Sequence, residues 1–241
     1  MTKRLFRAEM LLGTEFLENL KTKHVAVFGL GGVGSWCAEA LARSGIGRLS
    51  LIDEDDIGET NINRQIIALG STIGKSKAQV MAERILDINP DCEINIRHMR
   101  YEASTRDQFD FASYDYIADC IDLVSCKIDL IKTAIDRDIP ILSALGTGNK
   151  LRSEMLTVCD ISKTHSCPLA RVVRRELKAV GIYKHRVVFS PEKAVKPEQK
   201  EAPPPGRRSV PGSVAWVPAT AGLLMAQEIV LSLGESGTRE T

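Results

Sequence analysis

The sequence predicts an α/β protein with a Rossmann-like fold, in which a mainly parallel sheet is covered by helices on both faces. Three observations support this prediction. Short apolar runs alternate with amphipathic segments, a glycine-rich turn follows the first apolar run, and an acidic residue ends the second. Parallel strands buried on both faces appear as continuous apolar runs, and crossover helices separate them. The 241 residues suit one domain, 1–241, with a C-terminal extension.

The first half of the chain, 1–150, is predicted to be the nucleotide-binding half because its elements alternate regularly. Each apolar run is six to nine residues long, and each amphipathic segment is long enough for three or more helical turns. Pro90 closes the second of these helices. In chain order the predicted strands are 24–30, 48–53, 93–98, 114–122 and 139–146, and the predicted helices are 33–44, 75–89 and 124–137.

The second half, 151–241, is less regular and is predicted to be the substrate side. Its predicted elements are strands at 155–161 and 186–190, a helix at 169–181, a loop at 191–212 and a C-terminal helix at 214–233. The loop holds six prolines, which exclude a packed helix or a central strand. The last helix is long enough to cross a bilayer, but Pro218, Gln227 and Glu228 interrupt it. We expect a buried helix or a dimer contact, and no stable membrane insertion.

Composition excludes some classes of protein. Lys and Arg number 32 against 31 Asp and Glu, so a strongly basic nucleic-acid coat and an acidic tail protein are excluded, whereas a local basic patch is allowed. No apolar segment of signal-peptide length follows the charged N-terminus. The six cysteines form no C-x-x-C pair. We therefore expect a reduced, cytoplasmic protein without zinc.

A phosphate-binding turn is predicted where the first strand meets the first helix. Gly29, Gly31, Gly32 and Gly34 allow a tight turn and a close approach of the backbone to a phosphate, at a helix N-terminus with free N–H groups. Asp53 ends the second strand about 20 residues later, where an acid can accept hydrogen bonds from ribose hydroxyls. Alone, these features predict a nucleotide site without choosing between a dinucleotide and ATP.

The residues beyond Asp53 favour ATP. A hydride-transfer enzyme needs a flat apolar adenine slot there, whereas an enzyme that handles a triphosphate needs cations, which Arg64 and Lys77 can supply. Asp122, at the end of the fourth predicted strand, can hold Mg²⁺. The other polar side chains of this segment that we expect near ATP are Asp55, Asn61, Asn63 and Gln65.

Four motifs together resemble the ubiquitin-activating superfamily of adenylating enzymes, which includes the sulfur-carrier adenylyltransferases. They are GxGGVGS at 29–35, D-x-D…N-x-NRQ at 53–65, G-x-x-K at 74–77 and D-x-x-D at 119–122. The stretches RSGIGRLSLIDEDDI, NRQIIAL, AERILDINPDCE and PLARVVRRELK resemble the branch of tRNA threonylcarbamoyladenosine dehydratases. The resemblance covers about residues 4–180.

The resemblance implies roles for individual residues. It places Arg64 and Lys77 on phosphates, Asp53 on the ribose, and Asp122 on Mg²⁺ and in catalysis. It places Asn61, Asn63 and Gln65 around the same phosphates. It also implies a homodimer in which Arg7 reaches the γ-phosphate bound by the partner subunit. A sulfurtransferase-type partner and a bound monovalent cation are further associations that the resemblance leaves open.

Each of these side chains also has a purely structural interpretation. Arg64 can pair with the acidic run at 53–56, and Lys77 can be a solvated helix residue. Asp122 can cap the helix that begins near residue 124, and Arg7 can be an ordinary surface arginine. These interpretations stay open at the level of sequence.

A basic helix is predicted at 169–181. Leu169, Val173, Leu177 and Val180 form its apolar stripe, and the cations on its other side suit contacts to tRNA phosphates. A solvated face balanced by acids elsewhere is the alternative. The cations are Arg171, Arg174, Arg175 and Lys178.

The resemblance implies ATP-dependent dehydration of threonylcarbamoyladenosine in tRNA, through an adenylate of its carboxylate. The sulfur-carrier relatives commonly hold zinc on two C-x-x-C pairs, which this sequence lacks, and none of its cysteines is a compelling nucleophile. Three alternatives remain: adenylation of a small sulfur-carrier protein, nicotinamide-dependent oxidoreduction, and an ATP-binding tRNA scaffold without activity.

Overall fold

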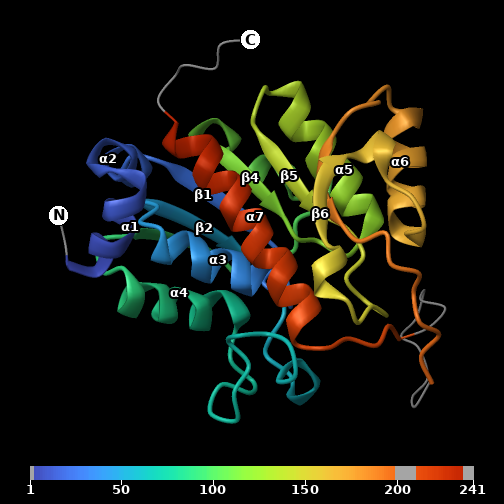
Figure 1. Ribbon diagram of the computed structural model, residues 1–241, viewed down its shortest axis with the longest axis horizontal. Helices are drawn as coiled ribbons and strands as arrows, with labels where there is room; N and C mark the ends of the chain where they lie inside the picture. The colour runs from blue at the N-terminus through green and yellow to red at the C-terminus, as the bar shows by residue number, and fades with distance from the viewer. Residues whose placement is uncertain (1–2, 199–209, 236–241) are drawn as a thin grey trace.

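The computed structural model describes residues 3–198 and 210–235, which fold around one sheet (Figure 1). The sheet has seven strands in the order β3-β2-β1-β4-β5-β7-β6. Every pairing is parallel except that of β6 with β7. The strands are β1 His24–Phe28, β2 Arg48–Ile52, β3 Glu93–Arg97, β4 Tyr116–Asp119, β5 Ile141–Ala144, β6 Thr157–Asp160 and β7 Arg186–Phe189. The predicted Rossmann-like, mainly parallel sheet is confirmed.

Helices cover both faces of this sheet (Figure 1). They are α1 Phe6–Leu12, α2 Thr14–Lys21, α3 Gly34–Arg43, α4 Lys77–Ile88, α5 Val124–Asp136, α6 Pro168–Ala179 and α7 Trp216–Gly234. Short 3-10 helices lie at Lys3–Leu5, Glu59–Asn61, Arg106–Gln108, Phe111–Ser113, Ser153–Met155 and Ile161–Lys163. The sheet continues without a break from the predicted nucleotide-binding half into the predicted substrate half.

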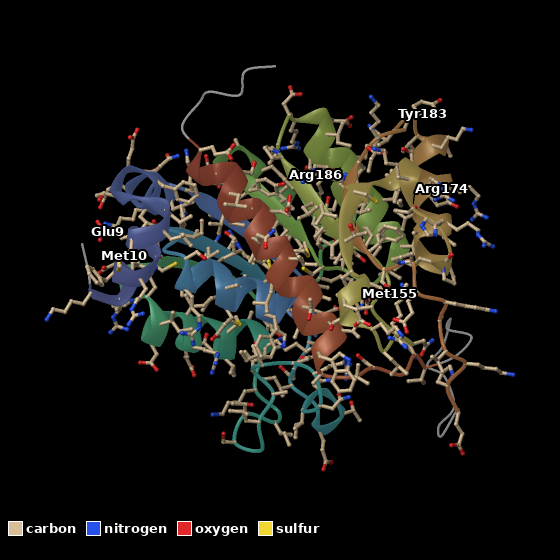
Figure 2. All side chains as sticks on the ribbon, in the orientation of Figure 1. Glu9, Met10, Met155, Arg174, Tyr183 and Arg186 are labelled. Atoms are coloured by element: carbon tan, nitrogen blue, oxygen red, sulfur yellow. The ribbon has the colours of Figure 1, made fainter. Side chains whose placement is uncertain are left out.

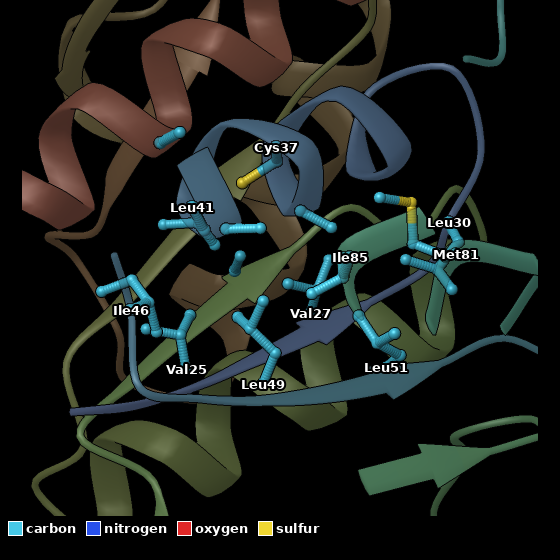
Figure 3. Close-up of a cluster of buried hydrophobic side chains, with 14 of the residues drawn as sticks. Val25, Val27, Leu30, Cys37, Leu41, Ile46, Leu49, Leu51, Met81 and Ile85 are labelled. Atoms are coloured by element: carbon cyan, nitrogen blue, oxygen red, sulfur yellow. The ribbon is translucent and has the colours of Figure 1, made fainter. Parts of the chain in front are cut away.

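The core has two layers because successive side chains of a strand point to opposite faces. On β1, Val25 and Val27 belong to the layer under α3, α4 and α7, which Figure 3 shows in part. Ala26 and Phe28 belong to the other layer, with α5, α6 and the segment 99–114. All five residues of β1 are buried, so its apolar run reflects a strand covered on both faces.

The N-terminal helices α1 and α2 were not predicted from the sequence. Helix α1 is seven residues long and buries none of its side chains, and α2 buries only Leu17 and Leu20. Segments this short give little apolar periodicity, so their helical state depends on contacts with the rest of the fold. Arg4 contributes one such contact, since its guanidinium donates hydrogen bonds to the carbonyls of Asp87 and Ile88 at the end of α4.

Helix α7 lies diagonally across α3 and is a core element (Figure 1). By length and composition it is the single helix among the described residues that could cross a membrane, yet half of its most apolar window is buried in the fold. Gly222 lets the two backbones approach, because a Cβ placed there would lie 2.4 Å from the carbonyl oxygen of Val33. This close contact between α7 and α3 is typical of a helix packed inside the fold.

Replacing Gly222 with alanine is expected to lower the free energy of unfolding by about 1–3 kcal/mol, although alanine favours helix, because the contact is with backbone. Urea denaturation measures the change. Gly70→Ala is the matched control, since nothing lies within 4 Å of a Cβ there. Equal stability of the two variants would show that α3 and α7 are not closely packed at Gly222.

Candidate active site

A cleft of about 840 Å³ opens beyond the carboxyl ends of β1, β2, β4 and β5. This is the edge at which open parallel sheets bind ligands. Both predicted halves of the chain contribute to it. Its walls include the glycine turn at 29–33, residues 53–55 and 99–101, the side chains of Arg64, Gln65 and Lys77, residues 120–123, the loop at 146–150, and residues 167–169 and 210–213.

The glycine turn brings backbone N–H groups to the floor of the cleft. Gly29 has a φ of +89°, and a Cβ there would lie 2.8 Å from the carbonyl oxygen of Cys120. At Gly34, where α3 begins, a Cβ would lie 1.8 Å from the carbonyl oxygen of Gly29. Only glycine fits these two positions. The N-terminus of α3 therefore faces the cleft as a site for an anion.

Asp53, Asp55 and Lys77 form an ion cluster next to this turn, in which Lys77 is buried and Asp55 is exposed. The Asp53 carboxylate accepts hydrogen bonds from the N–H groups of Leu30 at 2.5 Å and Asp55 at 2.9 Å. Lys77 Nζ lies 2.7 Å from the Asp55 carboxylate and 3.8 Å from that of Asp53. Burial raises the pKa of Asp53, and Lys77 opposes the rise. Lys77 is 5% exposed, so it is not a solvated helix residue.

Arg64 lies beside the glycine turn, with its Cγ 3.3 Å from the position of a Cβ on Gly32. Its guanidinium donates hydrogen bonds to the carbonyl of Thr60 at 2.7 Å and to Asn63 Oδ1 at 3.1 Å. The indole N–H of Trp36 donates to the backbone carbonyl of Arg64. Burial lowers the pKa of Arg64, which the charge of Asp122 opposes. Arg64 makes no ion pair with residues 53–56 in the described chain, so pairing with that acidic run does not explain its position.

The three amide side chains of this segment have different surroundings. Gln65 is 5% exposed and lines the cleft, and its Oε1 has no hydrogen-bond partner among the described residues. A buried carbonyl oxygen without a partner suits a ligand that can donate to it. Asn61 accepts a hydrogen bond from the N–H of Gly58 and fixes the local turn. Asn63 is exposed and is not part of the cleft wall, but it donates to the carbonyl of Ser213, which is.

Asp122 follows β4 and reaches the cleft as an exposed carboxylate. Helix α5 begins two residues later, and no side chain caps its N-terminus, so helix capping is not the role of Asp122. Within the part of the chain that the structure describes, Asp122 accepts no hydrogen bond, and its charge acts on Arg64. It stands free for a cation or a ligand.

A buried polar network under Asp122 fixes the loop after β4. Asp119 and Lys127 form an ion pair at 2.7 Å with both side chains fully buried. Ser143 Oγ donates to Asp119 at 2.6 Å and lies 2.8 Å from His185 Nε2. Asp119 Oδ1 also accepts a hydrogen bond from the N–H of Ile121. The D-x-x-D motif signals Asp119, but no sequence pattern links Lys127, Ser143 and His185, which lie on α5, β5 and the segment before β7.

Acidification is expected to destabilise the fold through His185, whose pKa is lowered to about 3 by burial and then by the charge of Lys127. Between pH 6.5 and 3 this ring is protonated in the unfolded chain but neutral in the folded chain. The free energy of unfolding therefore falls as pH falls. From pH 7.5 to 5.5 the wild type should lose about 1.4 kcal/mol more than His185→Gln in urea denaturation. Equal losses would show that His185 is not held neutral.

Arg7 and the predicted tRNA-binding cations lie away from the wall of the cleft. Arg7 is exposed on α1. The labelled α1 residues Glu9 and Met10 lie on the opposite side of the view from Arg174 on α6 (Figure 2). Arg174 donates hydrogen bonds to the carbonyl and hydroxyl of Thr164, and Arg175 pairs with Glu176. The remaining two cations of α6 are exposed: Arg171 and Lys178.

The cleft fits ATP. It combines the N-terminus of α3, the buried cation of Lys77, the guanidinium of Arg64 and the unpartnered oxygen of Gln65. Among residues 3–198 and 210–235, no three His, Cys, Asp or Glu side chains come together to hold a metal ion. A metal at this site would therefore need ligand atoms from the nucleotide besides Asp122. The predicted absence of zinc stays a prediction.

Comparison with known proteins assigns this arrangement to a family. The ThiF family profile matches residues 4–241. This chain belongs to the ThiF family. A relative from Bacillus subtilis, tRNA threonylcarbamoyladenosine dehydratase, is 43% identical over 97% of this chain and 95% of its own length. The Escherichia coli protein of the same name is 40% identical over 78% of this chain and 73% of its own length.

Solved structures agree with the ThiF assignment. The E. coli tRNA N6-threonylcarbamoyladenosine dehydratase in complex with AMP has a TM-score of 0.87 and 36% identity, covering 96% of this chain and 94% of that chain. Its complex with ATP has a TM-score of 0.86, also at 36% identity, covering 96% of this chain and 93% of that chain. The prediction of an adenylating-type enzyme in this superfamily is confirmed.

Proposed function

We propose that this ThiF-family enzyme uses ATP to dehydrate threonylcarbamoyladenosine in tRNA, through an adenylate of the threonyl carboxylate. One observation carries the proposal: a single cleft joins the glycine turn and its helix N-terminus to Lys77, Arg64 and Asp122, and Asp122 has no ion-pair partner among the described residues. Nicotinamide chemistry has no use for these charges, whereas transfer of AMP needs them. The similarity to the dehydratases of B. subtilis and E. coli supports the choice of substrate.

The chemistry explains why a carboxylate needs ATP. A carboxylate is a poor electrophile because its charge is delocalised and its oxygen leaves badly. Its oxygen attacks the α-phosphorus, pyrophosphate leaves, and the mixed anhydride then carries AMP as a good leaving group. A group within the same modification attacks the carbonyl carbon, which closes a ring and releases AMP. The substrate loses the elements of one water, ATP takes them up as it becomes AMP and pyrophosphate, and no protein thiol takes part.

The proposed roles of this chain's residues follow from their charge and position. Arg64 and Lys77 neutralise phosphate oxygens while charge moves from the α-phosphorus to the leaving pyrophosphate, and the N-terminus of α3 binds another phosphate. Asp53 accepts hydrogen bonds from the ribose hydroxyls. Gln65 Oε1, which has no partner among the described residues, accepts a hydrogen bond from a donor group of the bound ligand. Asp122 would hold Mg²⁺ with phosphate oxygens, which suits an ion that usually takes one or two carboxylates.

Binding of tRNA is proposed for the exposed cations of α6, with Arg171 and Lys178 free for phosphodiester contacts and Arg174 holding the adjacent loop at Thr164. A homodimer is proposed through α1, whose Phe6, Met10 and Leu11 expose apolar side chains. In such a dimer Arg7 would reach the partner's cleft. A cytoplasmic location, a monovalent cation and a sulfurtransferase-type partner stay predictions.

The test is one incubation of the purified protein with ATP, Mg²⁺ and tRNA that carries threonylcarbamoyladenosine. Mass spectrometry of the digested nucleosides should show loss of one water, and chromatography should show one AMP for each water lost. A nucleoside of unchanged mass would overturn the assignment of threonylcarbamoyladenosine as the substrate. Formation of an adenylate on a small carrier protein in the same preparation would then favour the sulfur-carrier alternative.

A further inference from the structure

Lys150 is a cleft residue to which the proposed chemistry assigns no role. It lies in the loop after β5, at the wall of the cleft, and is 2% exposed. Lysine is rarely buried this deeply unless its charge is paired, because removing an ammonium group from water is costly. Here no carboxylate lies within ion-pair distance of the Lys150 ammonium in the described chain.

The ammonium group of Lys150 has more N–H donors than hydrogen-bond partners in the described chain. Its Nζ donates one hydrogen bond, of 2.6 Å, to the carbonyl of Ser190. A lysine ammonium carries three N–H donors, so two are left without a partner among residues 3–198 and 210–235. Burial lowers the pKa of Lys150, and the groups that oppose the shift are Cys167 and Glu192. An anionic ligand would supply the compensating charge that this site lacks.

The backbone on both sides of Lys150 is held rigidly. Asn149 has a φ of 61°, donates its N–H to the carbonyl of Gly212 and accepts at its own carbonyl from the N–H of Val195. On the other side, the N–H groups of Leu151 and Arg152 donate to the Glu192 carboxylate. Glu192 therefore holds the backbone and not the ammonium, and the position of Lys150 is set before any ligand binds.

The position of Lys150 separates it from the residues assigned to ATP. The ribose acid Asp53 follows β2, Asp122 follows β4, and Lys150 follows β5. In the sheet order β2-β1-β4-β5 the ends of β2 and β5 are three strand spacings apart, which is roughly 14 Å. Lys150 thus lies beyond Asp122, on the side of the cleft away from the ribose, where the group that accepts AMP must enter.

We propose that Lys150 binds the carboxylate of the acceptor and presents it to the α-phosphorus of ATP; the inference rests on the proposed function. Two anions must meet for AMP transfer, and a fixed cation beside one of them reduces their repulsion. The carboxylate oxygen that does not attack stays hydrogen-bonded to the ammonium, so the bond to phosphorus forms from the other oxygen. Lys150 gives up no proton in this step, and it distinguishes a carboxylate-bearing nucleoside from plain adenosine.

The experiment compares two tRNAs, one with the threonylcarbamoyl group that carries the carboxylate and one without that group. Wild type, Lys150→Met and Lys132→Met are each titrated with threonylcarbamoyladenosine tRNA and with the same tRNA bearing unmodified adenosine. α,β-Methylene ATP is present so that nothing reacts. Wild type should bind the modified tRNA about tenfold or more tightly, as expected for a charge-assisted hydrogen bond. Lys150→Met should lose this preference, whereas Lys132→Met, an exposed lysine of α5 paired with Asp136, should keep it.

Loss of fold is separated from loss of recognition by two further measurements. Binding of α,β-methylene ATP alone should be unchanged in Lys150→Met, since the nucleotide side of the cleft is intact. If Lys150→Met does not fold, Lys150→Gln, which can still donate to Ser190, is used and should lose the preference as well. A variant that keeps the wild-type preference, or a wild type without one, overturns the inference. Whether wild type dehydrates the nucleoside is measured separately, and that result alone decides the proposed function.

Discussion

Replacing Arg64 with alanine is expected to lower the rate of tRNA-dependent AMP formation by about 10²–10³-fold. The removed guanidinium is one of the cations that line the cleft, and its loss leaves phosphate charge unbalanced in the transition state. The effect should fall mainly on kcat, because this charge changes as pyrophosphate leaves. The rate is measured as radiolabelled AMP released from ATP at saturating tRNA.

The fold should tolerate this change, because within residues 3–198 and 210–235 the Arg64 side chain donates only to the Thr60 carbonyl and to Asn63. Arg137→Ala is the matched control: its exposed guanidinium lies over the ring of Phe111, away from the wall of the cleft. The control should keep the wild-type rate. An Arg64→Ala enzyme that also keeps it would contradict the assignment of Arg64 to the triphosphate.

Replacing Asp122 with asparagine is expected to lower the same rate by about 10²–10³-fold and to raise the Mg²⁺ concentration needed for half-maximal rate. Asparagine retains the size of the side chain but loses the charge that a hard divalent cation prefers. Because Asp122 caps no helix and accepts no hydrogen bond in the described chain, the substitution removes charge without removing a structural contact. A Mg²⁺ titration of the rate, at fixed ATP, measures both effects.

Asp136→Asn supplies the control for this second variant, since Asp136 lies at the other end of α5 and pairs with the exposed Lys132. Its Mg²⁺ titration should match that of wild type. If Asp122→Asn lowers the rate without shifting the Mg²⁺ titration, Asp122 acts on the reacting groups directly and does not hold the metal.

The alternation of strands and helices was predictable because each buried strand carries an uninterrupted apolar run. Predicted and observed strands agree to within three residues at each end, for example 24–30 against His24–Phe28. Strands extend only as far as their backbone pairing, and Gly29, with a φ of +89°, turns away from the sheet. Helices α1 and α2 could not be predicted in this way, since their stability depends on contacts with distant segments such as the end of α4.

That Asp53, Asp55, Asn61, Arg64 and Gln65 line the cleft was predictable because they cluster in sequence after β2, whereas their binding of ATP stays a prediction. The buried network of Asp119, Lys127, Ser143 and His185 was not predictable, since its members come from four separate segments and meet only in the folded chain. Lys150 was missed for a related reason, because a single lysine in a loop carries no signal until its burial is known. The centre of the predicted proline-rich loop, 199–209, lies outside the described residues.

The central claim, that transfer of AMP from ATP activates a carboxylate, is tested most directly with oxygen isotopes. Threonylcarbamoyladenosine tRNA labelled with ¹⁸O at both carboxylate oxygens is incubated with wild type, ATP and Mg²⁺, and the nucleotides are analysed by mass spectrometry. Attack of the carboxylate on the α-phosphorus places one of its oxygens in the leaving group, so each AMP should carry one ¹⁸O and pyrophosphate none. Unlabelled AMP, or label in inorganic phosphate with ADP as the product, would contradict activation by adenylation.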